Sequence, residues 1–228
     1  MTNKLKYFVG NWKMFGDFSS YKIIHRINRY IYKLKGSKNS KIVLCVPSTL
    51  IHSFRKKLKR KVICIGAQNC YHQEGYGPFT GAVSSGMLKK MGAEYIILGH
   101  SENRSEGETA QLIKKKIISA LNQKLNIIFC IGETYKDKER GRTFSVIRTQ
   151  IKSSLEKRFN KNKIILAYEP VWSIGTNKIP NIKDLQGVIK FIKNDFKKIF
   201  KTRKSPRVLY GGSVNSKNIK SLSTVAEI

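Results

Sequence analysis

The sequence predicts an α/β protein in which parallel strands alternate with helices and surround a common axis. Short apolar runs rich in β-branched residues alternate along the chain with longer stretches of helical periodicity. The runs are almost continuously hydrophobic, which is typical of strands buried on both faces of a parallel sheet. Polar residues with catalytic chemistry directly follow several of the runs, and they can converge only if the strands close into a barrel.

Seven apolar runs are predicted to be strands. Strict alternation of strand and helix requires a parallel sheet whose strands are joined by crossover helices. The predicted strands are Tyr7–Gly10, Ile42–Val46, Val62–Ile65, Tyr95–Leu98, Ile127–Ile131, Ile164–Ala167 and Val208–Tyr210.

Two of the intervening segments show the amphipathic helical pattern clearly. In the first, basic residues occupy the face opposite the apolar one, namely Lys22, Arg26, Arg29 and Lys33. The apolar faces consist of Ile23, Ile24, Ile27, Ile31 and Leu34 in the first helix, and of Leu185, Val188, Ile189, Ile192, Phe196 and Ile199 in the second.

The length and composition predict one globular domain over residues 1–228. A chain of 228 residues with 40% hydrophobic residues can bury a sizeable core, and a single α/β barrel commonly needs this length. We find no internal repeat, low-complexity tract or Pro/Gly-rich linker that would mark a domain boundary.

The formal net charge of +31, from 45 Lys and Arg against 14 Asp and Glu, raises the question of nucleic-acid binding. Nucleic-acid binders usually gather their charge on one face or in a block beside aromatic residues. Here the lysines recur along the whole chain, and the dense runs at residues 55–61 and 197–198 are typical of solvated helix faces and ends. We therefore expect a solvated basic surface and no nucleic-acid partner.

The four cysteines indicate free thiols in a reducing compartment. Cys45, Cys64, Cys70 and Cys130 form no CxxC pair and have no histidine at metal-ligand spacing, so no metal site is expected. The N-terminal apolar run is too short for a signal peptide or a membrane span. We expect a cytoplasmic protein with no membrane association.

Polar residues gather immediately after the predicted strands. In parallel α/β proteins the carboxyl ends of the strands carry the chemistry. The candidate site residues are Asn11 and Lys13 after the first strand, His100, Ser101 and Glu102 after the fourth, Glu169 after the sixth, and Gly211, Gly212 and Ser213 after the seventh.

Seven motifs in order resemble the triosephosphate isomerase family. They are GNWKM at 10–14, GAQN at 66–69, FTGAVS at 79–84, LGHSENR at 98–104, CIGET at 130–134, AYEPVWSIGT at 167–176 and YGGSVN at 210–215. The resemblance implies a (β/α)8 TIM barrel that interconverts dihydroxyacetone phosphate and D-glyceraldehyde 3-phosphate through an enediolate, in glycolysis and gluconeogenesis. It implies no cofactor, because proton transfer between adjacent carbons needs only acid, base and electrostatic groups.

The resemblance also implies catalytic roles. Glu169 is the base, with its basicity raised by enclosure in a closed site. His100 polarises the carbonyl as a neutral imidazole, because a helix beginning just after it lowers its pKa. Lys13 supplies positive charge for the enediolate and the phosphate, and Asn11 adds a neutral donor. Ser101 and Glu102 support them, with Glu102 holding the lysine and the histidine in place.

Residues 170–180 resemble the family's lid, which closes over the substrate and excludes water. The resemblance implies that the Gly175 and Ser213 amides bind the phosphate and that Tyr210 holds the closed lid. Asn177 stands where the family usually has glycine, a mild departure because Asn tolerates positive φ better than most residues.

The resemblance implies a homodimer, through the long loop at residues 66–84. Long loops without structure of their own are usually functional or disordered. In the resembled family this loop docks into a neighbouring subunit, so we expect Thr80 to reach toward the partner's site.

Only seven strands are present in the sequence, which stops at STVAEI where the resemblance implies an eighth strand, a second Gly-Gly turn and a closing helix. An open seam would leave two unpaired strand edges. We therefore expect the sequence to be incomplete at its C-terminus, and the 228-residue chain alone to have little activity.

Three alternatives remain. A different sugar-phosphate isomerase or synthase on the same fold would share the phosphate turn but would not need Lys13, His100 and Glu169 together with the lid. The second alternative is an inactive truncated barrel. The third, a basic anion-binding or nucleic-acid-binding protein, would use the net charge and would be expected to have lost catalytic groups, which are all present.

Overall fold

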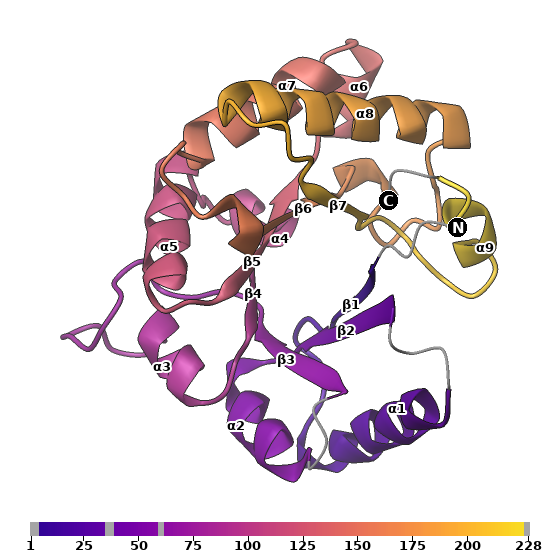
Figure 1. Ribbon diagram of the computed structural model, residues 1–228. Coiled ribbons are helices and arrows are strands. Elements are labelled where there is room, and N and C mark those ends of the chain that lie inside the picture. The colour runs from indigo at the N-terminus through magenta and orange to yellow at the C-terminus, as the bar shows by residue number, and fades with distance from the viewer. Residues whose placement is uncertain (1–4, 35–38, 59–61, 226–228) are drawn as a thin grey trace. The chain divides into compact units, whose positions relative to one another are not determined.

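The computed structural model describes residues 5–34, 39–58 and 62–225 (Figure 1). The strands are β1 Lys6–Asn11, β2 Ser40–Cys45, β3 Ile63–Ala67, β4 Tyr95–Leu98, β5 Asn126–Ile131, β6 Ile164–Tyr168 and β7 Arg207–Tyr210. The α-helices are α1 Tyr21–Lys33, α2 Ser48–Lys57, α3 Ser85–Lys90, α4 Ser101–Ser105, α5 Ala110–Asn122, α6 Tyr135–Glu139, α7 Thr143–Ser154, α8 Ile182–Ile199 and α9 Ile219–Leu222. Short 3-10 turns are η1 Phe18–Ser20, η3 Lys161–Lys163 and η4 Val171–Ser173.

All seven predicted strands are confirmed, with ends that shift by at most two residues. Their hydrogen-bonded order follows the chain, β1-β2-β3-β4-β5-β6-β7. The pairing is parallel, with Lys6 opposite Ser40 at one end of the sequence and Tyr168 opposite Tyr210 at the other. This arrangement confirms the predicted parallel sheet.

The chain divides into two compact units. Unit 1 comprises Met1–Ile97 and Ser119–Ile127, and unit 2 comprises Leu98–Ile118 and Ile128–Ile228. Each unit has its own buried residues and is described by itself. The candidate residues Asn11, Lys13 and Thr80 belong to unit 1, and the others belong to unit 2.

In unit 1 the apolar face of α1 is narrower than predicted. Ile24 and Ile31 are buried, whereas Ile23 is 52% exposed and Leu34 is 45% exposed. Successive helical residues point about 100° apart, so Ile23 cannot share the orientation of Ile24. Leu34 lies just after the last helical residue. The unit instead takes its core from β2, β3 and α2, whose fully buried members include Val43, Ile51, Phe54, Ile63 and Ile65.

The basic run at 55–61 begins in the last turn of α2, where Lys56 and Lys57 are exposed. This agrees with the solvated helix end predicted from the sequence. Residues 59–61 lie outside the described part of the chain.

In unit 2, α8 has the predicted buried face. Asn181 caps the helix by accepting a hydrogen bond from the Asp184 N–H. Its apolar side is buried except for the half-buried Ile199, and the helix packs beside α7 (Figure 1). The Phe144 and Phe191 rings pack at a tilt across that contact, with ring centroids 4.5 Å apart. The buried residues are Leu185, Val188, Ile189, Ile192 and Phe196.

The four cysteines are buried free thiols. Burial raises the pKa of Cys45 to about 12, so this thiol stays protonated at neutral pH. Within the described ranges, no cluster of three potential ligand side chains could hold a metal ion. The helices described there are also too short or too polar to cross a membrane.

Candidate active site

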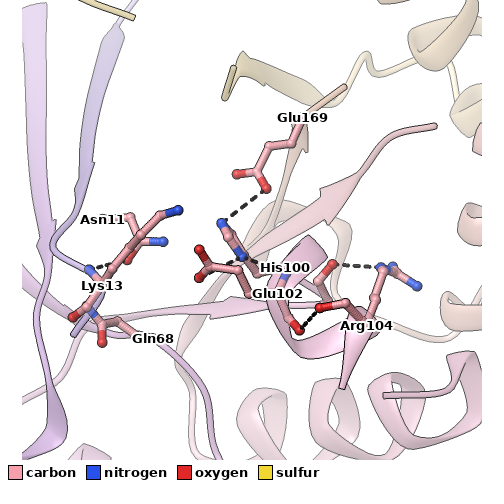
Figure 2. Close-up of polar contacts among 9 residues, drawn as sticks. Asn11, Lys13, Gln68, His100, Glu102, Arg104 and Glu169 are labelled. Atoms are coloured by element: carbon pink, nitrogen blue, oxygen red, sulfur yellow. Dashed lines mark hydrogen bonds and ion pairs between the residues drawn. The ribbon is translucent and has the colours of Figure 1, made fainter. Parts of the chain in front are cut away.

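Lys13 lies in unit 1, two residues after the end of β1, in a left-handed conformation with φ of 52°. An L-residue seldom adopts this region, and such residues persist only where the surroundings fix them. The Asn11 side chain accepts a hydrogen bond from the Lys13 N–H at 3.0 Å, and Gln68 donates to the Lys13 carbonyl at 2.8 Å (Figure 2). The same Gln68 amide donates to the Cys45 carbonyl at 3.0 Å.

Trp12 fixes the same loop from its other side. Its N–H donates to the Cys45 carbonyl at 2.9 Å, and its ring packs edge-on against Phe54 at 5.9 Å. Gly16 follows at φ of 97°, and a Cβ there would lie 2.8 Å from the Trp12 ring. The GNWKM motif therefore builds a fixed turn that presents Lys13.

His100 lies in unit 2 at the N-cap of α4. Its Nδ1 accepts a hydrogen bond from the Glu102 N–H at 3.2 Å, and the Glu102 carboxylate lies 3.5 Å from the same nitrogen. A nitrogen that accepts a hydrogen bond carries no proton, so this contact selects the neutral tautomer protonated at Nε2. The side chain is 7% exposed, and Ser101 follows it as the first residue of α4.

Glu169 follows β6 and lies close to His100 in the same unit (Figure 2). Its Oε2 is 3.7 Å from His100 Nε2, and its side chain is 12% exposed. Its N–H donates to the Ile131 carbonyl at 2.8 Å. The structure thus brings together two of the predicted catalytic groups, a nearly buried carboxylate and an imidazole.

Two glycines make room for Glu169. A Cβ at Gly211 would lie 2.5 Å from Glu169 Cγ and 2.8 Å from its Oε1. A Cβ at Gly132 would collide with the Glu169 carbonyl oxygen. Gly132 is itself held by Gln150, which accepts from its N–H and donates to its carbonyl, both at 2.9 Å. No larger residue fits at either glycine without moving Glu169.

The start of the lid is held by Glu133, a buried carboxylate from the CIGET motif. Trp172 Nε1 donates to it at 2.9 Å, and the Tyr168 hydroxyl lies 3.2 Å from both carboxylate oxygens. Burial raises the pKa of Glu133, while the Trp172 and Tyr168 donors oppose that shift. Lys138 Nζ lies 3.8 Å from the centre of the Trp172 ring, which adds a cation–π contact.

Ser173 connects the lid to the segment after β7. Its hydroxyl donates to the Lys178 carbonyl at 2.5 Å, and it has one proton to give. The Tyr210 hydroxyl, 2.8 Å away, is therefore the donor in their contact, and burial raises the pKa of Tyr210 and keeps it protonated. Ser213 donates to the Ser173 carbonyl at 2.6 Å through its hydroxyl, and its amide lies 3.4 Å from Ser173 Oγ.

The tip of the lid contains two residues at positive φ. Gly175 has φ of 71° and Asn177 has φ of 58°. Asn177 therefore takes up the left-handed conformation that its residue type is expected to tolerate. Both residues are exposed, and a Cβ at Gly175 would meet no atom within 4 Å.

Thr80 is exposed in the long loop of unit 1. The loop is held at its base, where the Tyr71 N–H donates to the Val83 carbonyl at 2.8 Å and the Tyr71 ring packs against Phe79 at 4.8 Å. Glu74 accepts hydrogen bonds from Asn122 and Gln123 at 2.7 and 2.6 Å. The loop is therefore ordered by its own contacts, and Thr80 lies on its exposed surface.

Sequence reasoning did not single out four residues that organise these groups. Each lies inside a quoted motif, so the motifs contained the only available signal. Which partners each would contact depends on the folded backbone, and no residue spacing indicates it. They are Gln68, Arg104, Glu133 and Ser173.

Comparison with known proteins identifies the same family over nearly the whole chain. The triosephosphate isomerase family model matches residues 6–228. The chain is 39% identical over 228 residues to triosephosphate isomerase of Dictyoglomus thermophilum, covering 98% of this chain and 90% of that protein. It is 39% identical over 221 residues to the Aquifex aeolicus enzyme, covering 96% and 88% of the two chains.

The fold also matches a solved structure. The crystal structure of triosephosphate isomerase from Bartonella henselae is 32% identical and superposes with a TM-score of 0.88. That match covers 98% of this chain and 90% of the other.

Proposed function

Because the chain belongs to the triosephosphate isomerase family and has its TIM-barrel fold, we propose that it interconverts dihydroxyacetone phosphate and D-glyceraldehyde 3-phosphate through an enediolate. The observation that carries this proposal is the separation of 3.7 Å between His100 Nε2 and Glu169 Oε2. A base and a proton donor at this distance can face two adjacent carbons of one small substrate.

Glu169 takes the proton from the carbon next to the carbonyl. The nearly buried side chain lies against Gly211 and the Glu169 N–H donates to the Ile131 carbonyl, so the position of the carboxylate is fixed before substrate binds. After transfer to the adjacent carbon, the same carboxylate returns to its starting state, and no external acid or base is consumed.

His100 stabilises the oxygen on which negative charge develops. Its Nδ1 accepts a hydrogen bond from the Glu102 N–H, which leaves the imidazole proton on Nε2. Nε2 is the nitrogen that faces the Glu169 carboxylate. In this family a neutral imidazole at a helix start polarises the substrate carbonyl. Glu102 thereby acts on His100 through its backbone, and Ser101 belongs to the same first helical turn.

Lys13 and Asn11 supply the remaining electrostatic stabilisation in this proposal. The fixed left-handed turn at Lys13 presents a cation with little freedom to reorganise. The Asn11 side-chain oxygen is occupied by the Lys13 N–H, which leaves its amide nitrogen as the group that can donate to substrate.

The lid and the segment after β7 bind the phosphate. Gly175 and Ser213 offer backbone amides, and a glycine permits close approach of an anion. The Ser213 amide now lies 3.4 Å from Ser173 Oγ, a long contact that a phosphate oxygen can replace. Tyr210 and Ser173 keep the lid next to this segment, so that water is excluded during proton transfer.

We also propose that residues 1–228 belong to one catalytic domain of a cytoplasmic homodimer. The support for the dimer is a group of exposed apolar residues in unit 1, since large exposed apolar side chains commonly mark interfaces. Thr80 lies in the same loop as two of them. A monomer at micromolar concentration in sedimentation would contradict the dimer. The exposed apolar residues of unit 1 on which the dimer is proposed are Met14 at 94% exposed, Tyr76 at 76%, Phe15 at 73% and Phe79 at 36%.

Glu169→Gln in the full-length protein tests the function. The amide cannot accept the proton, so kcat is expected to fall by roughly 10²–10⁴-fold, the usual contribution of general base catalysis. Glu139→Gln, which makes the same change at an exposed position of α6, serves as the control. Both variants should keep the wild-type circular dichroism spectrum. Wild-type protein that does not isomerise glyceraldehyde 3-phosphate, or a Glu169→Gln variant with unchanged turnover, would contradict the proposal.

A further inference from the structure

Arg104 joins two backbone carbonyls of unit 2, at the carboxyl ends of β4 and β5, beside the catalytic groups. It belongs to α4, yet its side chain turns back toward β4 and β5 (Figure 2). Its Nε donates to the Gly99 carbonyl at 2.7 Å and its Nη2 donates to the Cys130 carbonyl at 3.2 Å. The planar guanidinium presents several donors in a fixed fork, which suits it to hold two carbonyls at set positions.

The first of these carbonyls belongs to the residue directly before His100. Gly99 has φ of 71°, and a Cβ there would lie 2.9 Å from Arg104 Nη2 and 3.1 Å from Phe129. The guanidinium therefore fills the space that the glycine leaves, with its central carbon 5.9 Å from the centre of the Phe129 ring. The backbone that orients the His100 imidazole is thus held by Arg104.

Arg104 also brings a positive charge into a region with little water. Burial lowers its pKa, and attraction to Glu108, Cys130 and Glu169 opposes that shift. Attraction between two charges is mutual, so the Arg104 charge favours the ionised form of Glu169. Glu108 is buried and forms an ion pair with Lys116, which provides counter-charge behind the guanidinium.

We propose that Arg104 is a positioning residue for the isomerisation, which fixes His100 through the Gly99 backbone and favours the ionised form of Glu169. This inference rests on the proposed function. Within unit 2, His100 Nε2 lies 3.7 Å from the carboxylate and Arg104 attracts it, while Glu102 lies beside the far nitrogen of the imidazole. Arg104 is thus the permanent cation among them.

Two substitutions in the full-length protein separate the effect of charge from that of geometry. Arg104→Gln removes both, so kcat should fall by about tenfold to a hundredfold, as expected for a small misplacement of catalytic groups. Loss of the cation favours protonated Glu169, so the acid limb of the kcat/KM profile should move to higher pH. Arg104→Lys keeps the charge but lacks the planar fork that holds the two carbonyls at fixed positions, so kcat should fall while the acid limb stays in place.

Arg148→Gln is the matched control. Arg148 also pairs with a buried partner, Asp195, at 2.8 Å, and also contacts a phenylalanine ring, that of Phe191, at 5.0 Å. These contacts join α7 to α8, so the loss of Arg148 should lower the melting temperature and leave the pH profile unchanged.

The outcomes distinguish this inference from the proposed function. Inactive wild-type protein would overturn the function, whereas active wild type with an Arg104→Gln profile that superimposes on it would overturn the role of Arg104. If Arg104→Gln does not fold, Arg104→Lys decides, and wild-type kcat in that variant would contradict the positioning role. The ¹⁵N shifts of the His100 imidazole give a readout without turnover, because a displaced backbone should alter the Nδ1 signal.

Discussion

The two ends of the proposed chemistry, the cation of unit 1 and the base of unit 2, are held in different ways. Lys13 is fixed through its backbone, in a left-handed conformation bounded by hydrogen bonds with Asn11 and Gln68. Glu169 is fixed through the space around it, because Gly132 and Gly211 lie against its main chain and side chain. The position of Lys13 depends on hydrogen bonds, and that of Glu169 depends on two neighbouring residues being glycine.

This difference predicts which kind of substitution displaces Lys13 and which kind displaces Glu169. Adding a single carbon beside Glu169 moves the carboxylate, whereas the long Lys13 side chain can adapt to small changes in packing. Removing the Gln68 donor from the Lys13 turn takes a hydrogen bond away from the Lys13 carbonyl itself. Added side-chain atoms should therefore displace mainly Glu169, and the loss of a hydrogen bond should displace mainly Lys13.

Among the changes that test this comparison, the largest effect is expected from Gly211→Ala. The new Cβ would lie 2.5 Å from Glu169 Cγ, so the carboxylate must move away from its position facing His100. We expect kcat to fall by about 10²-fold, the cost of roughly 1 Å of misplacement. Gly187→Ala in α8 adds the same atom where nothing lies within 4 Å, and should raise stability by about 0.4–1 kcal/mol. Equal kcat in the two variants would remove the steric account of Glu169.

An intermediate effect is expected from Gln68→Leu. It removes the donor to the carbonyls of Lys13 and Cys45, so the free energy of unfolding should fall by about 1–3 kcal/mol. The loosened turn should lower kcat/KM by about tenfold, the effect of weakening one preorganised electrostatic group by about 1.4 kcal/mol. Gln73→Leu, at an exposed position of the same unit, is the control for both measurements. If stability falls while kcat/KM stays at the wild-type value, the turn does not position Lys13.

The smallest effect is expected from Asn177→Gly. Asn177 already has φ of 58°, which glycine adopts without strain, but glycine also gains freedom in the unfolded chain. Stability should change by less than about 1 kcal/mol. A more mobile lid should alter kcat by no more than a few fold, with KM changing in the same variant. A large loss of activity would indicate that the Asn177 side chain does more than tolerate its conformation.

Much of the fold followed from periodicity because buried parallel strands leave a strong signal in the sequence. All seven strands appear where continuous apolar runs were found. The first helix was less well predicted, since Ile23 is apolar but exposed, and composition alone does not distinguish neighbouring helical positions. Residues that face water on a helix can be apolar at modest cost.

The candidate site was only partly predictable for a physical reason. His100 and Glu169 were found because they follow strands and belong to specific motifs, and the structure places them together. The contacts of Arg104 and Ser173 were not predicted. The first depends on the Arg104 side chain folding back onto the Gly99 carbonyl, and the second on the single proton of the Ser173 hydroxyl going to the Lys178 carbonyl. Such contacts arise from tertiary geometry and leave no periodic pattern.

The close fit between Gly211 and Glu169 also constrains how this sequence can change over time. A larger residue at position 211 has room only if the side chain at position 169 is shortened or withdrawn. Either step alone passes through a form whose base is misplaced or cannot reach its carbon. Inherited variation at these two positions is therefore coupled, and the pair is expected to stay unchanged for as long as proton transfer is selected.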